Sequence, residues 1–275
     1  MRGGIRFVDE NLRAAMRFFG EASASGEVQS AEPVQLIYSG LDYGVFNIAL
    51  LTRPVTSERD LNEIIANCGR YYRQRNVRWS FWVCDDLLEP PARRNNREIF
   101  TEAGLRVISR APGMFASALY PPSRPLPEIE CRPVNDAASR SAFTGLTVSC
   151  FDIPIGVARA IYERESAWNG AYRGFVGFVK GTPVAIVALV RAGGALGVYS
   201  LGTVPEYRHK GYGEALLRAA SASYRAASGD DSRDPSDPQT AEQEPIVLES
   251  TEAGYRLYRR IGFQDVTNFT VYLTR

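Results

Sequence analysis

The stretch from Val198 to Ala220, VYSLGTVPEYRHKGYGEALLRAA, constrains the fold more than any other part of the chain. Its apolar start leads to Pro205, which lacks the backbone N–H that a sheet ladder requires, so we expect a strand to end there. From Gly213 onward the residues are strong helix formers, and Leu216 and Ala220 fall on one face. The pattern therefore predicts a strand, a basic loop with glycines, and then a helix.

The loop from Val204 to Gly213, which we call the anion loop, is suited to a negatively charged ligand. A helix N-terminus leaves backbone N–H groups without partners and carries about half a positive charge. The glycines let the backbone approach a ligand, and the basic residues add side-chain donors. Two common phosphate loops do not fit, because Gly-Lys-Ser/Thr is absent and no Gly-x-Gly-x-x-Gly follows a strand. The pattern that remains is Arg-x-x-Gly-x-Gly, and its predicted ligand is a pyrophosphate.

This pattern resembles the acyl-CoA-binding signature of the GNAT superfamily of N-acetyltransferases. In that family the loop amides hold the CoA pyrophosphate, and the preceding strand diverges from its neighbour and offers backbone groups to the pantetheine arm. The resemblance implies acetyl-CoA, or another acyl-CoA, as the cofactor. The implied cofactor site consists of Gly202, Thr203, Val204, Arg208, His209, Lys210, Gly211, Tyr212, Gly213 and Glu214. The alternative is a surface turn with a solvated basic loop.

A second signature of the family lies between Leu248 and Phe263, where a strand leads into a helix ending in Tyr-x-x-x-Gly-Phe. Tyr258 holds the tyrosine position, and the resemblance implies that it is the catalytic acid. A tyrosine with a reference pKa of about 10 is protonated at neutral pH and can give a proton to a departing thiolate. Packing in the core is the alternative role. An asparagine often stands seven residues earlier, where this chain has Thr251, so a cofactor contact there stays open.

The base that takes the proton of the amine is not settled by the sequence. Many relatives carry a glutamate in the strand before the loop, but Ala195 to Thr203 contains no carboxylate. Glu249, Tyr199 or a chain of water molecules could serve instead. His209 lies inside the anion loop, where a phosphate or solvent contact explains it better than proton transfer does.

The length of 275 residues exceeds one acetyltransferase unit and predicts two domains. Four prolines between Tyr120 and Pro127 predict a stiff linker, which separates residues 1–122 from residues 128–275. The first part parallels the later portion of an acetyltransferase unit, but Thr52 to Glu58, where the anion loop should stand, contains no glycine. We interpret residues 1–122 as a degenerate copy that lost CoA binding, with an unrelated α/β cap domain as the alternative.

The predicted fold class is α/β, of the α+β type, with two GNAT-like domains. Each has a mixed, mostly antiparallel central sheet flanked by helices. Six local expectations can be compared with the structure. Three concern the first part of the chain before Arg75, namely a helix over Asn11 to Ala24, a hairpin of Val34 to Gly40 with Gly44 to Thr52, and Ser57 as the cap of a helix that follows it. The others are a strand pair that turns at Pro112 and Gly113, a polar acidic insertion over Ser228 to Pro245, and a closing strand of the second domain over Val266 to Leu273.

Composition excludes several functions. A net charge of +1 argues against a nucleic-acid surface, and no apolar run approaches the length of a membrane span. The N-terminal pattern is amphipathic and differs from a signal peptide. Four cysteines without Cys-x-x-Cys spacing and a single histidine argue against a zinc site and are typical of buried thiols in a reduced cytoplasm. We therefore expect a cytoplasmic protein without metal, membrane or nucleic-acid partners.

Together these features predict an enzyme, an N-acetyltransferase that moves an acetyl group from acetyl-CoA to a primary amine by direct attack. A cysteine relay is disfavoured because neither Cys131 nor Cys150 has a neighbouring histidine. The acceptor could be a small molecule or a peptide amine, with Phe151, Asp152 and Trp168 lining its pocket, and the chain could form a homodimer. The alternative from another class is a CoA-binding regulatory or interaction protein without turnover.

Overall fold

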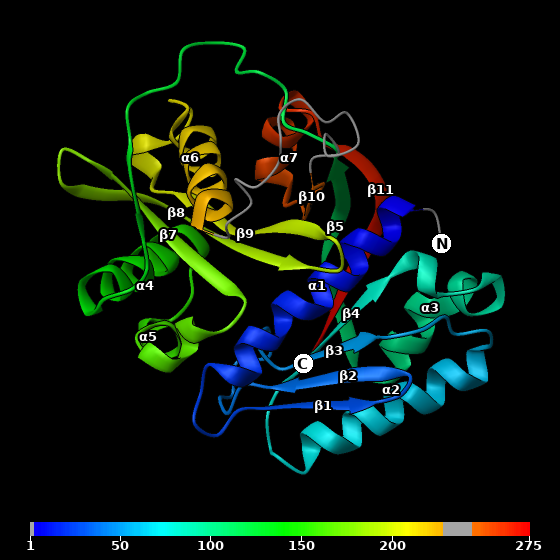
Figure 1. Ribbon diagram of the computed structural model, residues 1–275. Coiled ribbons are helices and arrows are strands. Elements are labelled where there is room, and N and C mark those ends of the chain that lie inside the picture. The colour runs from blue at the N-terminus through cyan, green and yellow to red at the C-terminus, as the bar shows by residue number, and fades with distance from the viewer. Residues whose placement is uncertain (1–2, 228–243) are drawn as a thin grey trace.

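The computed structural model describes residues 3–227 and 244–275 (Figure 1). In the first half of the chain the strands are β1 Glu27–Ala31, β2 Val34–Tyr38, β3 Ile48–Leu51, β4 Ser80–Cys84 and β5 Leu105–Ala116. In the second half they are β6 Glu130–Pro133, β7 Tyr172–Val179, β8 Thr182–Ala192, β9 Ala195–Thr203, β10 Ile246–Glu249 and β11 Gln264–Thr274. Within these residues all the strands form one sheet, in the order β1-β2-β3-β4-β11-β5-β10-β9-β8-β7-β6.

Seven α-helices of the described residues accompany this sheet. They are α1 Gly3–Glu21, α2 Glu58–Arg73, α3 Pro90–Glu102, α4 Ala137–Phe151, α5 Ile155–Tyr162, α6 Tyr212–Ala227 and α7 Glu252–Arg260. The predicted hairpin of β2 and β3 and the Ser57 cap of α2 are confirmed, the latter by a bond from the Asp60 amide to the Ser57 hydroxyl. Helix α1 begins eight residues earlier than the predicted Asn11 start. Residues 228–243 of the predicted acidic insertion lie outside the described residues.

The two halves repeat one order of elements. Strands β1, β2 and β3, helix α2, strand β4, helix α3 and strand β5 correspond in order to β7, β8, β9, α6, β10, α7 and β11. In each half, the strand before the first of these helices pairs in parallel with the strand after it, as β3 with β4 and β9 with β10. Neighbouring strands elsewhere in the sheet are antiparallel. The fold is thus mixed and mostly antiparallel, as the sequence predicted.

The two halves also share their long strands. Strands β5 and β11 pair with each other along nearly their whole length, while β11 pairs on its other edge with β4, and β5 with β10. The last strand of the chain therefore lies among strands of the first half. The predicted sheets of two separate domains are merged into one, and the proposed division at residues 122 and 128 falls in the segment between β5 and β6.

The predicted strand pair around Pro112 and Gly113 is wrong, because β5 runs through both residues without a turn. Gly113 instead allows neighbouring elements to pack closely against β5. A Cβ placed on it would lie 2.6 Å from Cγ2 of Thr267 and 3.1 Å from Cγ1 of Val8. The glycine lets β11 and α1 approach β5, and the Pro-Gly pair imitates a turn signal only in the sequence.

Helices cover both faces of the sheet. Helices α1, α4 and α5 lie on one face, and α2, α3, α6 and α7 lie on the other. Phe7 of α1 stacks on Phe115 at 6.0 Å, whereas Phe100 of α3 stacks on Tyr272 at 3.9 Å from the opposite side. Helix α1 crosses the sheet where the halves meet and contacts strands of both, as Figure 1 shows.

Asn11 attaches α1 to the second half. Its side chain is fully buried, and its amide nitrogen donates to the carbonyl oxygens of Val190, Ala192 and Ala195 at 2.9 to 3.0 Å. Its oxygen accepts a hydrogen bond from the Tyr199 hydroxyl at 2.7 Å. One buried amide of the first half thus holds the β8–β9 turn and a side chain of β9.

Replacing Asn11 by alanine should destabilise the protein by about 3 kcal/mol, because buried carbonyl and hydroxyl groups lose their partner. Chemical unfolding measured against urea concentration tests this. Asn95→Ala is the matched control, since the Asn95 amide makes an exposed bond to Glu58 at 2.7 Å. Its effect should stay within about 0.5 kcal/mol. Equal unfolding midpoints for the two variants would contradict the role given to Asn11.

Candidate active site

The anion loop connects β9 to α6 through a short 3-10 turn, Pro205–Tyr207. Two of its residues adopt left-handed backbone conformations, His209 with φ of 60° and Gly211 with φ of 95°. A Cβ on Gly211 would lie 3.0 Å from Cδ of Pro127. Both the backbone conformation and the close approach therefore require glycine at this position, directly before the first turn of α6.

The basic side chains of the loop stay available for a ligand. Arg208 donates through Nε to the Thr203 carbonyl at 2.9 Å, and Lys210 donates through Nζ to the Glu206 carbonyl at 2.8 Å. Neither these two nor His209 forms an ion pair with an acidic side chain of residues 3–227 or 244–275. The loop is thus a cluster of cations next to a helix N-terminus.

Glu214 differs from the other predicted cofactor residues. Its side chain is only 3% exposed, and its carboxylate pairs with Arg218 at 2.9 Å and with Arg260 at 3.2 Å. The pair with Arg218 lies within α6, and the pair with Arg260 connects α6 to α7. The negative charge is neutralised in the interior, so the Glu214 side chain is not a ligand of the anion.

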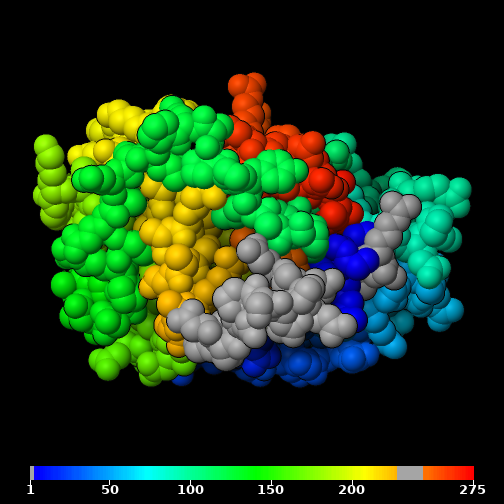
Figure 2. Space-filling view, turned by 45° about the horizontal axis from the view of Figure 1, so that its top comes forward, coloured from blue at the N-terminus to red at the C-terminus, as the bar shows by residue number. Residues whose placement is uncertain are grey.

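The segment between β5 and β6 lies over α6 and α7, as Figure 2 shows. The Tyr120 amide donates to the Ile261 carbonyl at 2.9 Å, and Arg218 donates to the Tyr120 carbonyl at 2.6 Å. Further along, Arg124 donates to the His209 carbonyl at 3.3 Å. The proline-rich linker predicted from the sequence therefore packs beside the anion loop.

Strands β9 and β10 diverge next to this loop. Their parallel pairing covers only Leu196 with Ile246 and Gly197 with Val247, after which β9 follows β8 and β10 follows β5. A bulge in β9 places Ser200 at φ of 49°, and the Tyr172 hydroxyl bonds to its side chain at 2.8 Å. We call the opening beyond Gly197 and Val247 the strand gap. Its bulged edge leaves backbone groups without ladder partners.

The equivalent place in the first half is closed. After β3 and β4 end, the Val55 amide still donates to the Leu87 carbonyl at 2.8 Å, and the Glu89 amide donates to the Val55 carbonyl at 3.0 Å. The first turn of α2 carries the acidic residues Glu58 and Asp60, which oppose an anion at this N-terminus. The first half therefore has neither the gap nor the basic loop.

Tyr258 of α7 lies on the α6 and α7 face of the sheet. Its side chain is 8% exposed and packs edge-to-face on Phe263, with 5.6 Å between ring centres. The hydroxyl has no hydrogen-bond partner within the described part of the chain. Burial raises the pKa of Tyr258, so the hydroxyl keeps its proton at neutral pH.

A group of polar side chains lies on the opposite face, under α1. Tyr199 and Glu249 each stand two residues past the last bonded pair of β9 and β10, so both project to this face. Glu249 is partly exposed as a residue, but its Oε1 is sealed from solvent and has no hydrogen-bond partner among the described residues. Burial, with a smaller contribution from the charge of Asp9, raises the pKa of Glu249 to about 8.

Asp9 and Asn11 were not identified from the sequence as site residues. Burial raises the pKa of Asp9 to about 6, although its ion pair with Arg13 at 2.6 Å acts in the opposite direction. Both residues stand beside the apolar Val8 and Leu12 on the buried side of α1. The sequence could have indicated a role for Asp9 and Asn11, because both are polar residues on the buried side of an amphipathic helix. Nothing in the sequence indicated that this helix packs on β9 and β10.

The predicted acceptor pocket is partly wrong. Trp168 is 5% exposed and its Nε1 donates to the Tyr162 carbonyl at 2.8 Å, so it belongs to the aromatic core. Phe151, in contrast, is 38% exposed, and its Cζ would lie 3.1 Å from a Cβ on Gly202 of β9. Phe151 therefore borders the strand gap, and Asp152 ends α4 with a left-handed φ of 54°.

The cysteines do not form reactive thiolates. Burial raises the pKa of Cys68 and of Cys84 to about 12 and that of Cys131 to about 11. Burial also raises the pKa of Cys150, despite the charge of Arg208 nearby. The described residues contain no group of His, Cys, Asp and Glu that could hold a metal ion. Within the same residues, no helix combines the length and the apolar character needed to span a membrane.

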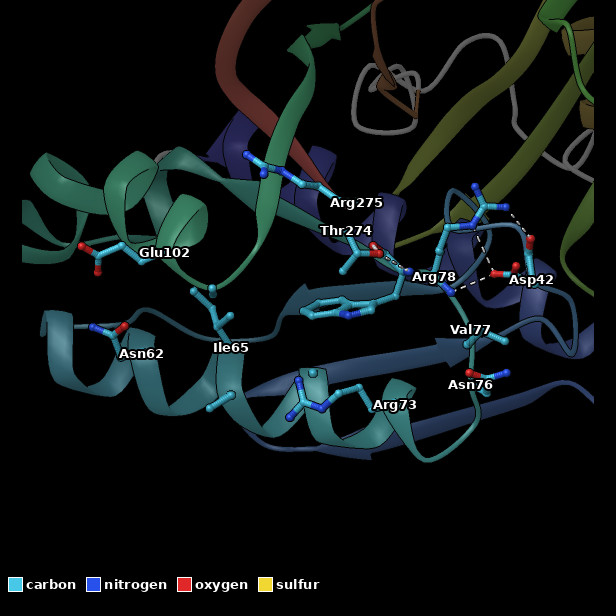
Figure 3. A pocket seen from close by; sticks show the side chains of 14 residues that line it. Asp42, Asn62, Ile65, Arg73, Asn76, Val77, Arg78, Glu102, Thr274 and Arg275 are labelled. Atoms are coloured by element: carbon cyan, nitrogen blue, oxygen red, sulfur yellow. Dashed lines mark hydrogen bonds and ion pairs between the residues drawn. The ribbon is translucent and has the colours of Figure 1, made fainter.

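A pocket of about 740 Å³ lies between the end of α2 and the start of β4, and Thr274 and Arg275 at the end of β11 also line it (Figure 3). Its lining includes Arg73, Arg78 and Trp79, and Arg78 bonds to Asp42 at 3.3 Å. The pocket lies at the N-terminal start of β4, whereas ligands of parallel strands bind beyond their carboxyl ends. Despite the volume of this pocket, the candidate site is the strand gap, because the basic loop lies there.

Comparison with known proteins agrees with this geometry. Residues 170–265 match the family model described as "Acetyltransferase (GNAT) domain". The match spans most of the second half, from β7 to the start of β11, with the anion loop and Tyr258 inside it. Residues 170–265 of the chain are therefore similar to a GNAT acetyltransferase domain.

Solved structures resemble the whole chain. A GCN5-related N-acetyltransferase from Kribbella flavida has 17% identity and a TM-score of 0.67, covering 98% of this chain and 95% of that one. A functionally unknown conserved protein from Staphylococcus epidermidis has 12% identity and a TM-score of 0.60, covering 90% and 94%. A GCN5-related N-acetyltransferase from Sphaerobacter thermophilus has 14% identity and a TM-score of 0.54, covering 90% and 81%. These likenesses establish the fold alone, and a search of curated proteins gave no match.

The buried carboxyl of Glu249 predicts a pH dependence of stability. Its pKa rises from an ordinary 4.5 to about 8, so the folded state holds more protons than the unfolded state between these values. The free energy of unfolding should then fall with rising pH across this window, by up to about 1.4 kcal/mol per pH unit from this group. Asp9 acts in the same direction between 3.8 and about 6.

Glu249→Gln should remove most of this dependence, so that the variant gains stability over the wild type as the pH rises from 5 to 8. Chemical unfolding at several pH values measures the difference. Glu252→Gln, at an exposed position in the first turn of α7, is the control and should follow the wild-type curve. A constant difference between Glu249→Gln and the wild type would show that Glu249 titrates normally.

Proposed function

We propose that the protein transfers an acetyl group from acetyl-CoA to a primary amine by direct attack of the amine. The observation that carries this proposal is the anion loop beside the strand gap, with its basic side chains left without acidic partners among residues 3–227 and 244–275. Arg208, Lys210 and the backbone around Gly211 would hold the pyrophosphate, and the bulged edge of β9 would face the pantetheine arm. Acetyl-CoA would supply the activated acyl group as a thioester.

Tyr258 would act as the acid. Its hydroxyl is protonated, has no hydrogen-bond partner in the described residues, and belongs to the helix that follows β10 at the strand gap. A buried hydroxyl in this state can give its proton to a leaving sulfur without first breaking another bond. The acceptor would approach from the side of Phe151, on the α1, α4 and α5 face.

The first half would not bind a second CoA. Its strands are bridged at Val55, and its helix N-terminus carries two carboxylates and a serine cap. This supports the proposal that residues 1–122 derive from a copy of the same unit that lost the cofactor site.

Calorimetric titration with acetyl-CoA tests the cofactor site. The double variant Arg208→Glu, Gly211→Asp should bind at least about 100-fold more weakly than the wild type, because a charge-assisted contact is lost and the loop backbone is strained. The matched control is Arg106→Glu, Gly104→Asp in the first half, where Gly104 has φ of 82° and open space around it. The control should bind like the wild type.

Absence of acetyl-CoA binding by the wild type would contradict the proposed function. Binding without release of free CoA, across a panel of small amines and peptides, would instead favour the CoA-binding protein without turnover.

Tyr258→Phe should lower kcat by about 10²-fold and leave acetyl-CoA affinity within about twofold, because only the proton donor is removed. The release of free CoA with an acetylated amine from the panel measures kcat. Tyr255→Phe is the control on the same helix, since the Tyr255 hydroxyl is tied to Asp265 at 2.7 Å near the surface. Similar rates for both variants would assign Tyr258 to packing alone.

A further inference from the structure

We propose that Glu249 is the general base of the reaction and that helix α1 of the first half completes its site. This inference rests on the proposed acetyl transfer and adds a role for the first half that the sequence did not indicate. The groups concerned come from three separated elements, namely Asp9 and Asn11 of α1, Tyr199 of β9, and Glu249 of β10.

The position of Glu249 is fixed by the sheet. Glu249 pairs with Gly113 of β5, and the next amide, that of Ser250, donates to the Pro112 carbonyl at 2.9 Å. The strand therefore ends at Glu249, two residues past the last pair with β9, and its side chain projects to the α1 face beside the strand gap. The Oε1 atom is buried without a hydrogen-bond partner in the described residues, which is costly for a carboxylate that has only a structural role.

The polar groups next to Glu249 already have a hydrogen bond or an ion pair. The Tyr199 hydroxyl donates its proton to Asn11, and burial, with the charge of Glu249 adding to it, raises the pKa of Tyr199 well above its ordinary value. Asp9 is held in its ion pair with Arg13. Strand β9 carries no carboxylate over Ala195–Thr203. Among the described residues of the gap, Glu249 is thus the carboxylate with a fully buried oxygen that has no hydrogen-bond partner.

Helix α1 sets the electrostatics around this oxygen. The charged groups facing Glu249 are Asp9, with its partner Arg13, from α1, and the phenol of Tyr199 from β9, while β5 presents Gly113. The charge of Asp9 raises the proton affinity of Glu249, and Asn11 holds Tyr199 in place. A base with raised proton affinity removes a proton from an ammonium group more effectively than an exposed carboxylate does.

The proposed step balances as follows. The acceptor ammonium gives one proton to the Glu249 carboxylate, which frees the nitrogen lone pair. The nitrogen forms a bond to the thioester carbonyl carbon and the carbon–sulfur bond breaks, with its electron pair leaving on sulfur. Sulfur takes the proton of Tyr258, and the second proton lost by the nitrogen restores the tyrosine through solvent. Glu249 then releases its proton, so that the products are an amide, free CoA and one proton.

Glu249→Gln tests the base, with the exposed Glu252→Gln as control. Steady-state rates are measured against pH with an amine that the wild type acetylates. Glu249→Gln should lower kcat by about 10²- to 10³-fold and keep acetyl-CoA affinity within about twofold. The acidic limb of the wild-type profile should disappear, leaving a rate that follows ionisation of the amine itself. Glu252→Gln should keep the wild-type profile.

Asp9→Asn tests the contribution of α1. Removing the neighbouring negative charge should lower the proton affinity of Glu249 and move the acidic limb to lower pH, with acetyl-CoA binding unchanged. An unmoved limb would overturn the role given to α1. A Glu249→Gln enzyme with wild-type kcat and pH profile would overturn the base and leave the proposed acetyl transfer standing. A wild type that binds acetyl-CoA but acetylates no amine would refute both.

Discussion

The antiparallel pairing of β5 with β11 is the constraint on which the rest of the structure depends. These strands end the two halves in sequence, yet they lie side by side at the centre of the sheet, and each also pairs with a strand of the other half. Strand β5, the last strand of the first half, therefore pairs with β11 on one edge and with β10 on the other. Neither half can keep a complete sheet without the other, and the last residue of β10 is held in place by a strand of the first half.

The repeated order of elements makes the two halves a comparison within one molecule. In the second half, β9 and β10 diverge after two paired positions and a basic loop stands at the helix N-terminus. In the first half, the chain after β3 bridges to the chain after β4 at Val55, and the helix begins with carboxylates. The same topology thus forms an open end suited to an anion in one half and a closed end in the other. Local residues, not the fold, decide between the two.

Much of this could be predicted from the sequence, because its signals are local. The Arg-x-x-Gly-x-Gly loop, the Tyr-x-x-x-Gly-Phe helix and the Ser57 cap each lie within a short stretch, and the elements around them were expected in the right order. The sharing of β5 and β11 could not be predicted, because pairing over about 150 residues leaves no periodic signal in either strand. Pro112 and Gly113 led to the wrong prediction of a strand pair, because a Pro-Gly pair is typical of a turn.

In the candidate site too, only the residues in local sequence motifs could be predicted. Tyr258 and the loop residues stand in recognisable motifs, whereas Asp9 and Asn11 reach the strand gap only through tertiary packing of α1. Trp168 was expected at a pocket and lies in the aromatic core, since a large apolar ring after a helix has the same local pattern in both places. What the structure adds is the connection between the halves, through which α1 of the first half packs beside the strand gap of the second half.

Hydrogen–deuterium exchange of the intact protein with and without acetyl-CoA tests the central claim most directly. The account predicts that acetyl-CoA slows exchange over β9, the anion loop and the first turn of α6, while Thr52–Glu58 in the first half stays unchanged. Protection of Thr52–Glu58, or no protection of the anion loop at a saturating concentration, would contradict the assignment of the cofactor site to the strand gap of the second half.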